Sequence, residues 1–448
     1  MTKTLQVTGL VLVALLIAVW PTAHTISLRD LLLALTLVVF GFLAVRGRPA
    51  GWWQRLEWPL GLYAALTLWI FIVALFVSDE TAWSLGEIRG QWLKGLLALL
   101  AGGMVALAIR RDSALQRHAA IAILAALFLH IAYVDYLAVK DLVEHGQLTD
   151  RIRGLTKGPD TSNYLTNMLL VLLLAEVFLR ITRRPRFLPL STTVLSALIL
   201  LTLFSVYAES VRNGVIELSF VLMLFAILFV SENRQRFGKT TRALTVSALI
   251  VVPVVFAYLS YKTDERWQTF VDTIPLAMDT ETNRQWINLT RQHELRLSDG
   301  RLVDWSNYMR LARMKAGVDL TLENPWGVGF GRNAFGHAVM KKYGESSSHS
   351  HSGLIDLAVG TGIPGTLLWI GFLVSLATLA WRSFRQTRDY CALALLLLVT
   401  GYGTRMVLDS IIRDHMLQMF LFLAAFLAVI VASRLHGQQR ETSAPASV

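Results

Sequence analysis

Two histidines stand at the front edge of an apolar run in "SSSHSHSGLIDLAVGTGIPG", residues 346–365. Histidine titrates near neutral pH and is the commonest general base in enzymes. His349 and His351 are two residues apart, so their rings would point away from each other on a helix. No cysteine and no further histidine lies nearby, which disfavours a metal pair. The residues leave two interpretations open: histidines that face lipid headgroups, or a general base.

Two other segments stand out by their residue types. The turn "ESVRNG", residues 209–214, carries Ser210, Arg212 and Asn213. The segment "SDGRLVDWSNYMRLARMKAGVDLTLENPWGVGFGRNAFG", residues 298–336, joins an arginine to an amphipathic helix and a glycine-rich turn. Its members are Arg301, then the stripe Trp305, Tyr308, Leu311 and Met314, then Gly327, Gly329 and Gly331. A nucleotide-binding glycine loop needs a preceding strand in a βαβ unit, which is not predicted here. The turn therefore indicates a close approach of backbone to a neighbour or a ligand.

The composition predicts a membrane protein. The 448 residues are 54% hydrophobic and 16% charged, whereas soluble domains carry about 25% charged residues. Apolar runs long enough to cross a bilayer, roughly 20 residues, recur along most of the chain. We expect an all-α polytopic fold. The single cysteine, Cys391, lies inside an apolar run, so no intramolecular disulfide can form and a buried thiol is expected.

Twelve spans are predicted, near residues 5–21, 27–45, 58–78, 92–109, 119–138, 162–182, 188–209, 213–231, 243–262, 352–380, 389–410 and 416–433. The first is expected to be a retained helix rather than a signal peptide, because no small-residue cleavage site follows it. The predicted organisation is nine spans in residues 1–262, a large, mostly helical outward loop in 263–351, three spans in 352–435, and a cytoplasmic tail in 436–448.

Lysine and arginine at the span ends orient this arrangement. One set of connections, together with both termini, carries most of the basic residues and is predicted to be cytoplasmic: Arg46, Arg48, Arg55, Arg110, Arg111, Arg117, Arg180, Arg183, Arg184, Arg186, Arg234, Arg236, Lys239, Arg242, Arg382, Arg385, Arg388, Arg434 and Arg440. The opposite side holds residues 139–161 and the much longer stretch 263–350. We therefore expect the functional residues to face outward.

Several charged residues fall on the outward side or toward the outer ends of spans. The basic residues among them together suggest an anionic ligand there: Lys140, Arg151, Arg153, Lys157, Arg212 and Arg405. Arginine suits phosphate because a guanidinium group binds it with two hydrogen bonds. The intramembrane acids Asp135, Glu217 and Asp356 also fall toward the outer leaflet. A proton-driven transporter would need acids near the midplane and repeated halves. Neither is visible, so a flippase or small-solute transporter is the disfavoured, non-enzymatic alternative.

Taken in order, these segments resemble the O-antigen ligase and O-antigen polymerase superfamily. In that family an arginine follows a serine near a span start, an Arg-x3-Trp helix leads to a Pro-x-Gly-x-Gly turn, and a His-Asn pair precedes a Gly-x-x-Gly span. The matching positions are Arg212, Arg301 with Trp305, Pro325 with Gly327 and Gly329, and His351 with Gly362 and Gly365. Ser352 stands where the family usually has asparagine. The likeness covers about residues 190–430.

The resemblance implies a GT-C-like glycosyltransferase in the inner membrane of a Gram-negative bacterium. It would move a glycan from undecaprenyl diphosphate to the lipid A–core oligosaccharide at the periplasmic face, with inversion and without a metal or other cofactor. Membrane lipids would be its surroundings, and no nucleic-acid partner is implied. His351 would be the base, and Arg212 and Arg301 would hold the diphosphate. The implied substrate-binding residues are His349, Ser210, Asn213, Arg405, Arg153, Trp305, Gly327 and Gly329. Transfer to a lipid-linked glycan (a polymerase) or to a protein (an O-oligosaccharyltransferase) stays an alternative.

Overall fold

The computed structural model describes residues 2–46, 51–149, 151–233, 269–287, 295–297 and 299–443, with the single residues 238, 240 and 247. Within these residues the chain forms helices and no strands. Ten helical segments are long and apolar enough to cross a membrane, and the slightly shorter α1 is also apolar. The expectation of an all-α polytopic membrane protein is confirmed.

The helices of the bundle come in two groups along the chain. The first group is α1 (Thr2–Val19), α2 (Ile26–Arg46), the short η1 (Trp52–Leu56), α3 (Glu57–Ile72) with the π-turn η2 (Val73–Val77), α4 (Thr81–Glu87), the π-turn η3 (Ile88–Trp92), α5 (Leu93–Ile109), α6 (Ser113–His145), α7 (Pro159–Ile181), α8 (Thr192–Glu209) and α9 (Arg212–Glu232). The second is α15 (Gly353–Thr387), α16 (Tyr390–Leu408) and α17 (Asp414–Ser443).

All the predicted spans except one coincide with these helices. The ninth, residues 243–262, lies outside the described residues. One difference is at residues 139–161, where α6 continues to His145 before the loop begins. The apolar run ends at the membrane boundary, whereas the helical hydrogen bonds continue beyond it. Lys140 then pairs with Glu144, one turn further along the helix, at 3.7 Å.

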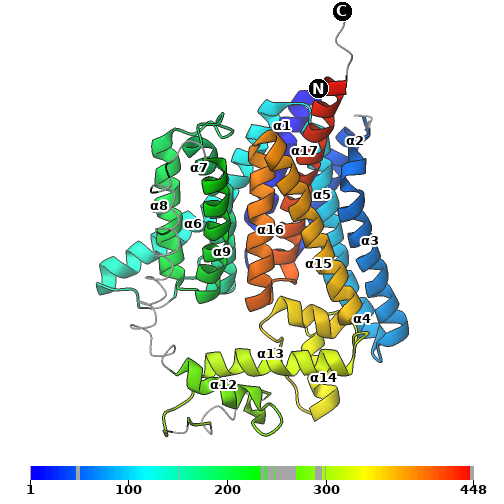
Figure 1. Cartoon of the computed structure of the whole chain (residues 1–448), viewed down its shortest axis with the longest axis vertical. Coiled ribbons are helices and arrows are strands. Elements are labelled where there is room, and N and C mark those ends of the chain that lie inside the picture. The colour runs from blue at the N-terminus through cyan, green and yellow to red at the C-terminus, as the bar shows by residue number, and fades with distance from the viewer. Residues whose placement is uncertain are drawn as a thin grey trace, which may run out of the picture.

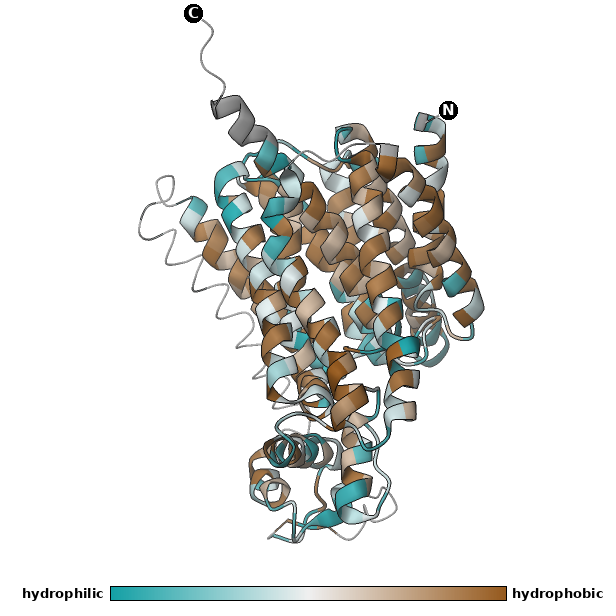
Figure 2. Cartoon of the chain, turned by 90° about the vertical axis from the view of Figure 1, so that its right-hand side faces the viewer, coloured by the Kyte–Doolittle hydropathy of each residue, from teal (hydrophilic) through white to brown (hydrophobic). Residues whose placement is uncertain are grey.

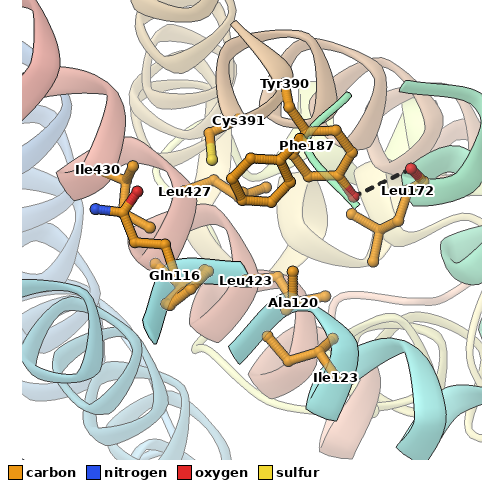
Figure 3. Close-up of a pocket in the computed structure, with 11 residues that line it drawn as sticks. Gln116, Ala120, Ile123, Leu172, Phe187, Tyr390, Cys391, Leu423, Leu427 and Ile430 are labelled. Atoms are coloured by element: carbon orange, nitrogen blue, oxygen red, sulfur yellow. Dashed lines mark hydrogen bonds between the residues drawn. The ribbon is translucent and has the colours of Figure 1, made fainter. Parts of the chain in front are cut away.

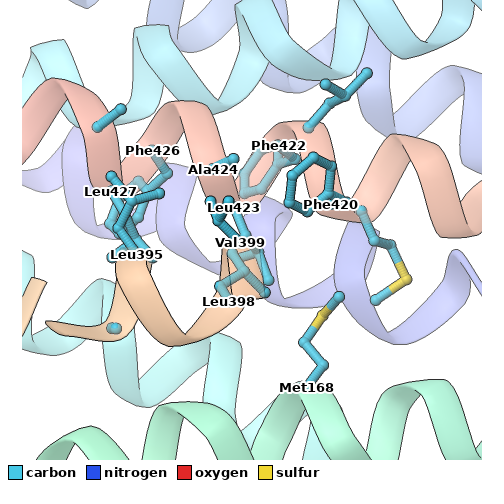
Figure 4. Close-up of a cluster of buried hydrophobic side chains, with 14 of the residues drawn as sticks. Met168, Leu395, Leu398, Val399, Phe420, Phe422, Leu423, Ala424, Phe426 and Leu427 are labelled. Carbon is cyan, nitrogen blue, oxygen red and sulfur yellow. The ribbon is translucent and has the colours of Figure 1, made fainter. Parts of the chain in front are cut away.

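α17 forms the centre of the bundle. Its residues from Met419 to Ala432 are apolar on all sides, which is typical of a helix with no lipid-facing or water-facing side. Figure 4 shows Phe420, Phe422, Leu423 and Phe426 of α17 among side chains of α16 and α7. On the α5 side, Gly102 lies so close that a Cβ there would be 2.0 Å from the Phe422 carbonyl oxygen. A glycine is therefore required for this helix contact.

A small apolar pocket lies between α6, α16 and α17 (Figure 3). Cys391 and Tyr390 line it, and the Tyr390 hydroxyl donates a hydrogen bond to the Leu172 carbonyl at 3.1 Å. The thiol is buried, as the sequence predicted. Gln116 is the polar side chain in a lining that is otherwise aliphatic and aromatic.

The segment between the two groups of helices forms a helical layer across one end of the bundle (Figure 1). It contains α12 (Phe270–Met278), the short η4 (Arg284–Trp286), α13 (Trp305–Glu323) and α14 (Ala334–Tyr343). Its own core includes Trp286, Tyr308, Ala312, Ala316, Phe335 and Val339. Hydrophobic residues dominate the bundle and hydrophilic residues its ends (Figure 2). The start of α1 and the end of α17 lie at the end opposite this layer (Figure 1).

Candidate active site

The histidine pair lies on a tight turn that leads into α15. Asp356, in the first turn of that helix, accepts hydrogen bonds from the Ser350 amide at 2.8 Å and the Ser410 hydroxyl at 2.6 Å. Ser352 caps the helix by accepting from the Ile355 amide at 3.4 Å. His351, between the two serines, has a φ of 65°, in the left-handed region that L-residues rarely adopt.

This turn brings the two rings together. On a helix the i, i+2 spacing would separate His349 and His351, but the left-handed residue reverses the chain and the ring centroids are 4.5 Å apart. Both side chains are half-buried. The left-handed conformation of His351 costs of order 1 kcal/mol or more. It accompanies the close approach of two titratable rings, and strained residues of this kind are common in active sites.

Three arginines surround the pair. Arg313 of α13 donates to the Ser348 hydroxyl at 2.7 Å and to the His349 carbonyl at 3.2 Å. Arg413, in the turn between α16 and α17, lies with its NH2 atom 3.3 Å from Nε2 of His349. Arg310, one turn before Arg313, also acts on His351. The positive charges of these arginines therefore act on the histidine pair.

Burial and these charges keep both histidines neutral. Burial, followed by the charge of Arg413, lowers the pKa of His349 to about 2. Burial, followed by the charges of Arg313 and Arg310, lowers the pKa of His351 to about 4. At neutral pH each ring can therefore accept a proton, and the surrounding space is electropositive.

The "ESVRNG" turn meets this site from the side. Arg310 donates to the Asn213 side-chain oxygen at 3.1 Å, and the Asn213 amide donates to the Leu408 carbonyl of α16 at 2.8 Å. Asn213 thus joins α9, α13 and α16. Arg212 is the first residue of α9, and Ser210 is an exposed residue in the left-handed conformation just before it.

Arg405 does not face the site as a free cation. It is fully buried, and its guanidinium contacts Glu217 at 3.0 Å, Asp409 at 3.3 Å, the Asn163 side chain at 2.8 Å and the Asp160 carbonyl at 2.8 Å. These partners come from α7, α9 and the turn after α16. This placement favours a structural role, in which Arg405 fixes the helix ends beneath the histidine turn, over the predicted contact with substrate.

The other expected ligand residues differ in their surroundings. Arg301 is half-exposed and pairs with Asp299 and, at 3.0 Å, with Asp272 of α12. Arg153 is exposed in the loop between α6 and α7. Trp305 begins α13 and packs on Tyr308 at a centroid distance of 5.4 Å, in the core of the helical layer.

The glycine-rich turn contacts a neighbouring backbone. The Gly329 amide donates to the Gly360 carbonyl at 3.0 Å, and the Ile363 amide donates to the Pro325 carbonyl at 2.9 Å. α15 is kinked at this point, since Gly362 has φ 69° and ψ −173°, far from helical values. The glycines of the two motifs, near 327 and near 362, therefore pack against each other. This contact fixes the start of α15, and so the histidine turn, against the helical layer.

Arg310, Arg313 and Arg413 were missed from the sequence. A signal existed for Arg313, because it lies on the stripe of α13 that also carries Tyr308, Ala312 and Ala316, where a charge is out of place. No such signal in the sequence marked Arg413, because only the fold brings the α16–α17 turn close to residue 349. Among the described residues, no three side chains of histidine, cysteine, aspartate or glutamate gather as a metal site would require.

Comparison with known proteins agrees with the placement of the motifs. Residues 197–370 match the family model described as O-antigen ligase. The match begins in α8, includes the "ESVRNG" turn and the histidine pair, and ends beyond the α15 kink. No curated protein sequence matches the chain.

Proposed function

We propose that this chain is an O-antigen ligase, because residues 197–370 match the family model described as O-antigen ligase. It transfers a glycan from undecaprenyl diphosphate to a sugar hydroxyl of the lipid A–core oligosaccharide. The observation that carries the proposal is a neutral, half-buried His351 surrounded by arginines at one end of a membrane bundle. That end faces the periplasm in the proposal, because most basic connecting residues lie at the other.

His351 is the general base in this mechanism. Nε2 of His349 already has Arg413 as a neighbour at 3.3 Å, and its pKa, lowered to about 2, makes it the poorer proton acceptor. The pKa of His351 is lowered less, to about 4. A diphosphate bound beside the arginines would offset their charge and raise that pKa toward neutrality, where a general base is most effective.

The arginines stabilise the leaving group. As the glycosidic bond to the diphosphate breaks, negative charge grows on the departing oxygen, and fixed positive charges in a partly dehydrated site favour that change. Arg310 and Arg413 are candidates beside the histidines, with Arg212 at the start of α9. Arg301 can join them, because its exposed pairs with Asp272 and Asp299 are each worth only about 0–1 kcal/mol and are readily exchanged for a diphosphate.

The reaction is a single displacement. The acceptor oxygen attacks the anomeric carbon from the side opposite the diphosphate, its proton passes to His351, and undecaprenyl diphosphate leaves. The anomeric configuration inverts. The arginines supply the positive charge that a divalent cation supplies in other transferases, which is the basis for proposing a metal-independent reaction.

Reconstitution of the full chain with lipid-linked O-antigen and purified lipid A–core tests the proposal. The expected product is lipopolysaccharide that carries O-antigen. Lengthening of lipid-linked chains without such a product would mean a polymerase, and transfer to a protein hydroxyl would mean an O-oligosaccharyltransferase. A His351→Ala chain that inserts normally should lose transfer and keep donor binding. Full activity of that variant would refute the assignment of the base.

A further inference from the structure

A polar pocket with no assigned role lies where α7 and α9 end. Its open space is about 140 Å³, and its lining is Thr182, Arg183, Arg184, Glu232 and Asn233. A single buried water needs only about 10–15 Å³, so the pocket is large enough for a phosphate group. We propose that it binds the phosphodiester headgroup of an anionic phospholipid. This site is separate from the histidine turn, and its binding does not depend on the proposed function.

The pocket lies about one membrane thickness from the histidine turn. α9 begins beside that turn, where Asn213 accepts a hydrogen bond from Arg310, and it ends at Glu232 after 21 residues. At 1.5 Å per residue this helix is about 30 Å long, which is the thickness of the hydrocarbon core of a bilayer. The pocket therefore lies at the opposite boundary between lipid and water, on the predicted cytoplasmic side. Basic pockets between helices at that boundary are typical binding sites for anionic headgroups.

The end of α7 is closed by backbone hydrogen bonds alone. The Arg184 amide donates to the Leu179 carbonyl at 2.8 Å and the Arg183 amide to the Arg180 carbonyl at 3.1 Å, which is the pattern of a Schellman motif. Arg183 is left-handed in this motif, with φ 57°. Glycine is the usual residue at such a position, because it adopts a positive φ without strain. An arginine carries that strain, which points to a use for its side chain other than closing the helix.

The pocket has an excess of positive charge. Glu232 is the acidic residue of its lining, and this carboxylate already contacts Arg388 at 2.5 Å and Arg184 at 3.5 Å. Within the described parts of the chain, the guanidinium of Arg183 has no hydrogen bond and no ion pair. Two arginines thus share one carboxylate, and Arg183 is left without one. A phosphodiester would supply the missing negative charge, since a guanidinium binds two phosphate oxygens at once.

The surroundings of the pocket favour a lipid over a soluble anion. Ile181 and Ile227 precede it on α7 and α9 and are 46% and 56% exposed, as side chains that face acyl chains are. A phospholipid held in the membrane by its acyl chains stays beside the pocket at a high effective concentration. Asn233 is buried, and its amide nitrogen donates to the Phe229 carbonyl at 2.9 Å. Its side-chain oxygen can accept a hydrogen bond from a headgroup hydroxyl, as in phosphatidylglycerol.

Lipid binding to the full chain in neutral detergent tests the inference. Phosphatidylglycerol and phosphatidylcholine with identical acyl chains are titrated and counted by native mass spectrometry. Arg183→Gln should weaken phosphatidylglycerol binding about tenfold and leave phosphatidylcholine binding unchanged. Arg186→Gln is the matched control, because Arg186 is an exposed arginine of the same loop outside the pocket lining, and its effect should stay within about twofold. Equal weakening by the two variants, or equal binding of the two lipids by the unaltered chain, would overturn the proposal.

A glycine variant separates binding from a structural role of the arginine. Arg183→Gly relieves the left-handed strain, so its thermal unfolding midpoint in lipid-free detergent should be unchanged or higher. Its binding of phosphatidylglycerol should still fall as in Arg183→Gln. A lower midpoint with full lipid binding would mean that Arg183 only stabilises the helix end.

Inorganic phosphate distinguishes a lipid from a soluble anion as the ligand. Phosphatidylglycerol should raise the unfolding midpoint of the unaltered chain and not that of Arg183→Gln. Inorganic phosphate should raise neither, because no acyl chains hold it beside the pocket. An equal rise with inorganic phosphate would assign the pocket to a soluble anion and refute the lipid site.

Discussion

The contact between the glycine-rich turn and the α15 kink leads to a quantitative prediction for Gly362→Ala. At φ 69° and ψ −173°, residue 362 is in a region open almost only to glycine, and another residue there costs about 1–3 kcal/mol. The new methyl group would also lie 2.3 Å from the Pro325 carbonyl oxygen and 2.6 Å from the Gly327 amide nitrogen. Forcing atoms into a packed site costs about 1–3 kcal/mol more. The expected loss of unfolding free energy is about 2–6 kcal/mol.

Gly371→Ala is the matched control, in the same helix. A Cβ at residue 371 meets side-chain atoms of Leu62 at 3.5 and 3.6 Å, which is ordinary contact. The assay is denaturant unfolding of both variants in the same detergent, followed by reconstitution and measurement of transfer. Gly362→Ala should also lower transfer, because the displaced turn fixes the start of α15 and hence the histidines. Equal stability of the two variants would refute the packing argument, since the physical reason for the glycine at 362 would then be absent.

Four further outcomes are expected. The acid limb of kcat/KM should lie near pH 4, the lowered pKa of His351, because protonation below that pH removes the proton acceptor; a limb near 6.5 would indicate a solvated base. Arg310→Ala should lower kcat/KM by about 10²-fold and shift this limb to higher pH, because the Arg310 charge helps to lower the pKa of His351. Arg301→Ala should weaken donor binding and leave the limb in place; a shift of the limb in that variant would place Arg301 next to the base. Arg405→Met should cost about 3–5 kcal/mol of unfolding free energy, since it leaves buried carboxylates unpaired; unchanged denaturant unfolding would show that the ion pairs are not needed.

The sequence was sufficient for the helices and for the order of the motifs. Apolar runs of bilayer length require helices whatever the tertiary arrangement, because backbone groups in lipid must bond within their own segment. Cys391 in such a run could only be a buried thiol. The histidines at 349 and 351 could be recognised as unusual because polar residues at the front of a span are costly unless they have a function.

Residue partners could not be predicted in the same way. The family resemblance implied that Arg301 holds the diphosphate, and the charge pattern placed Arg405 toward the outer leaflet. The sequence could not show their protein partners: Arg301 pairs with exposed carboxylates, and Arg405 is buried among helix ends. Arg413 is 62 residues from His351 in the numbering, and nothing local connects them. Such pairings depend on how helices pack, which is decided by contacts between distant segments.

What the sequence alone determined is therefore the all-α membrane class and the order of the apolar helices along the chain. The tertiary structure decided which arginines act on His351, that the rings of His349 and His351 lie side by side, and that the two glycine motifs pack on each other. The physical reason is that hydropathy and hydrogen bonding within a helix are local properties of the chain. Charge placement around a turn is a property of the packed helices, and it arises only when α13, α15 and the α16–α17 turn meet.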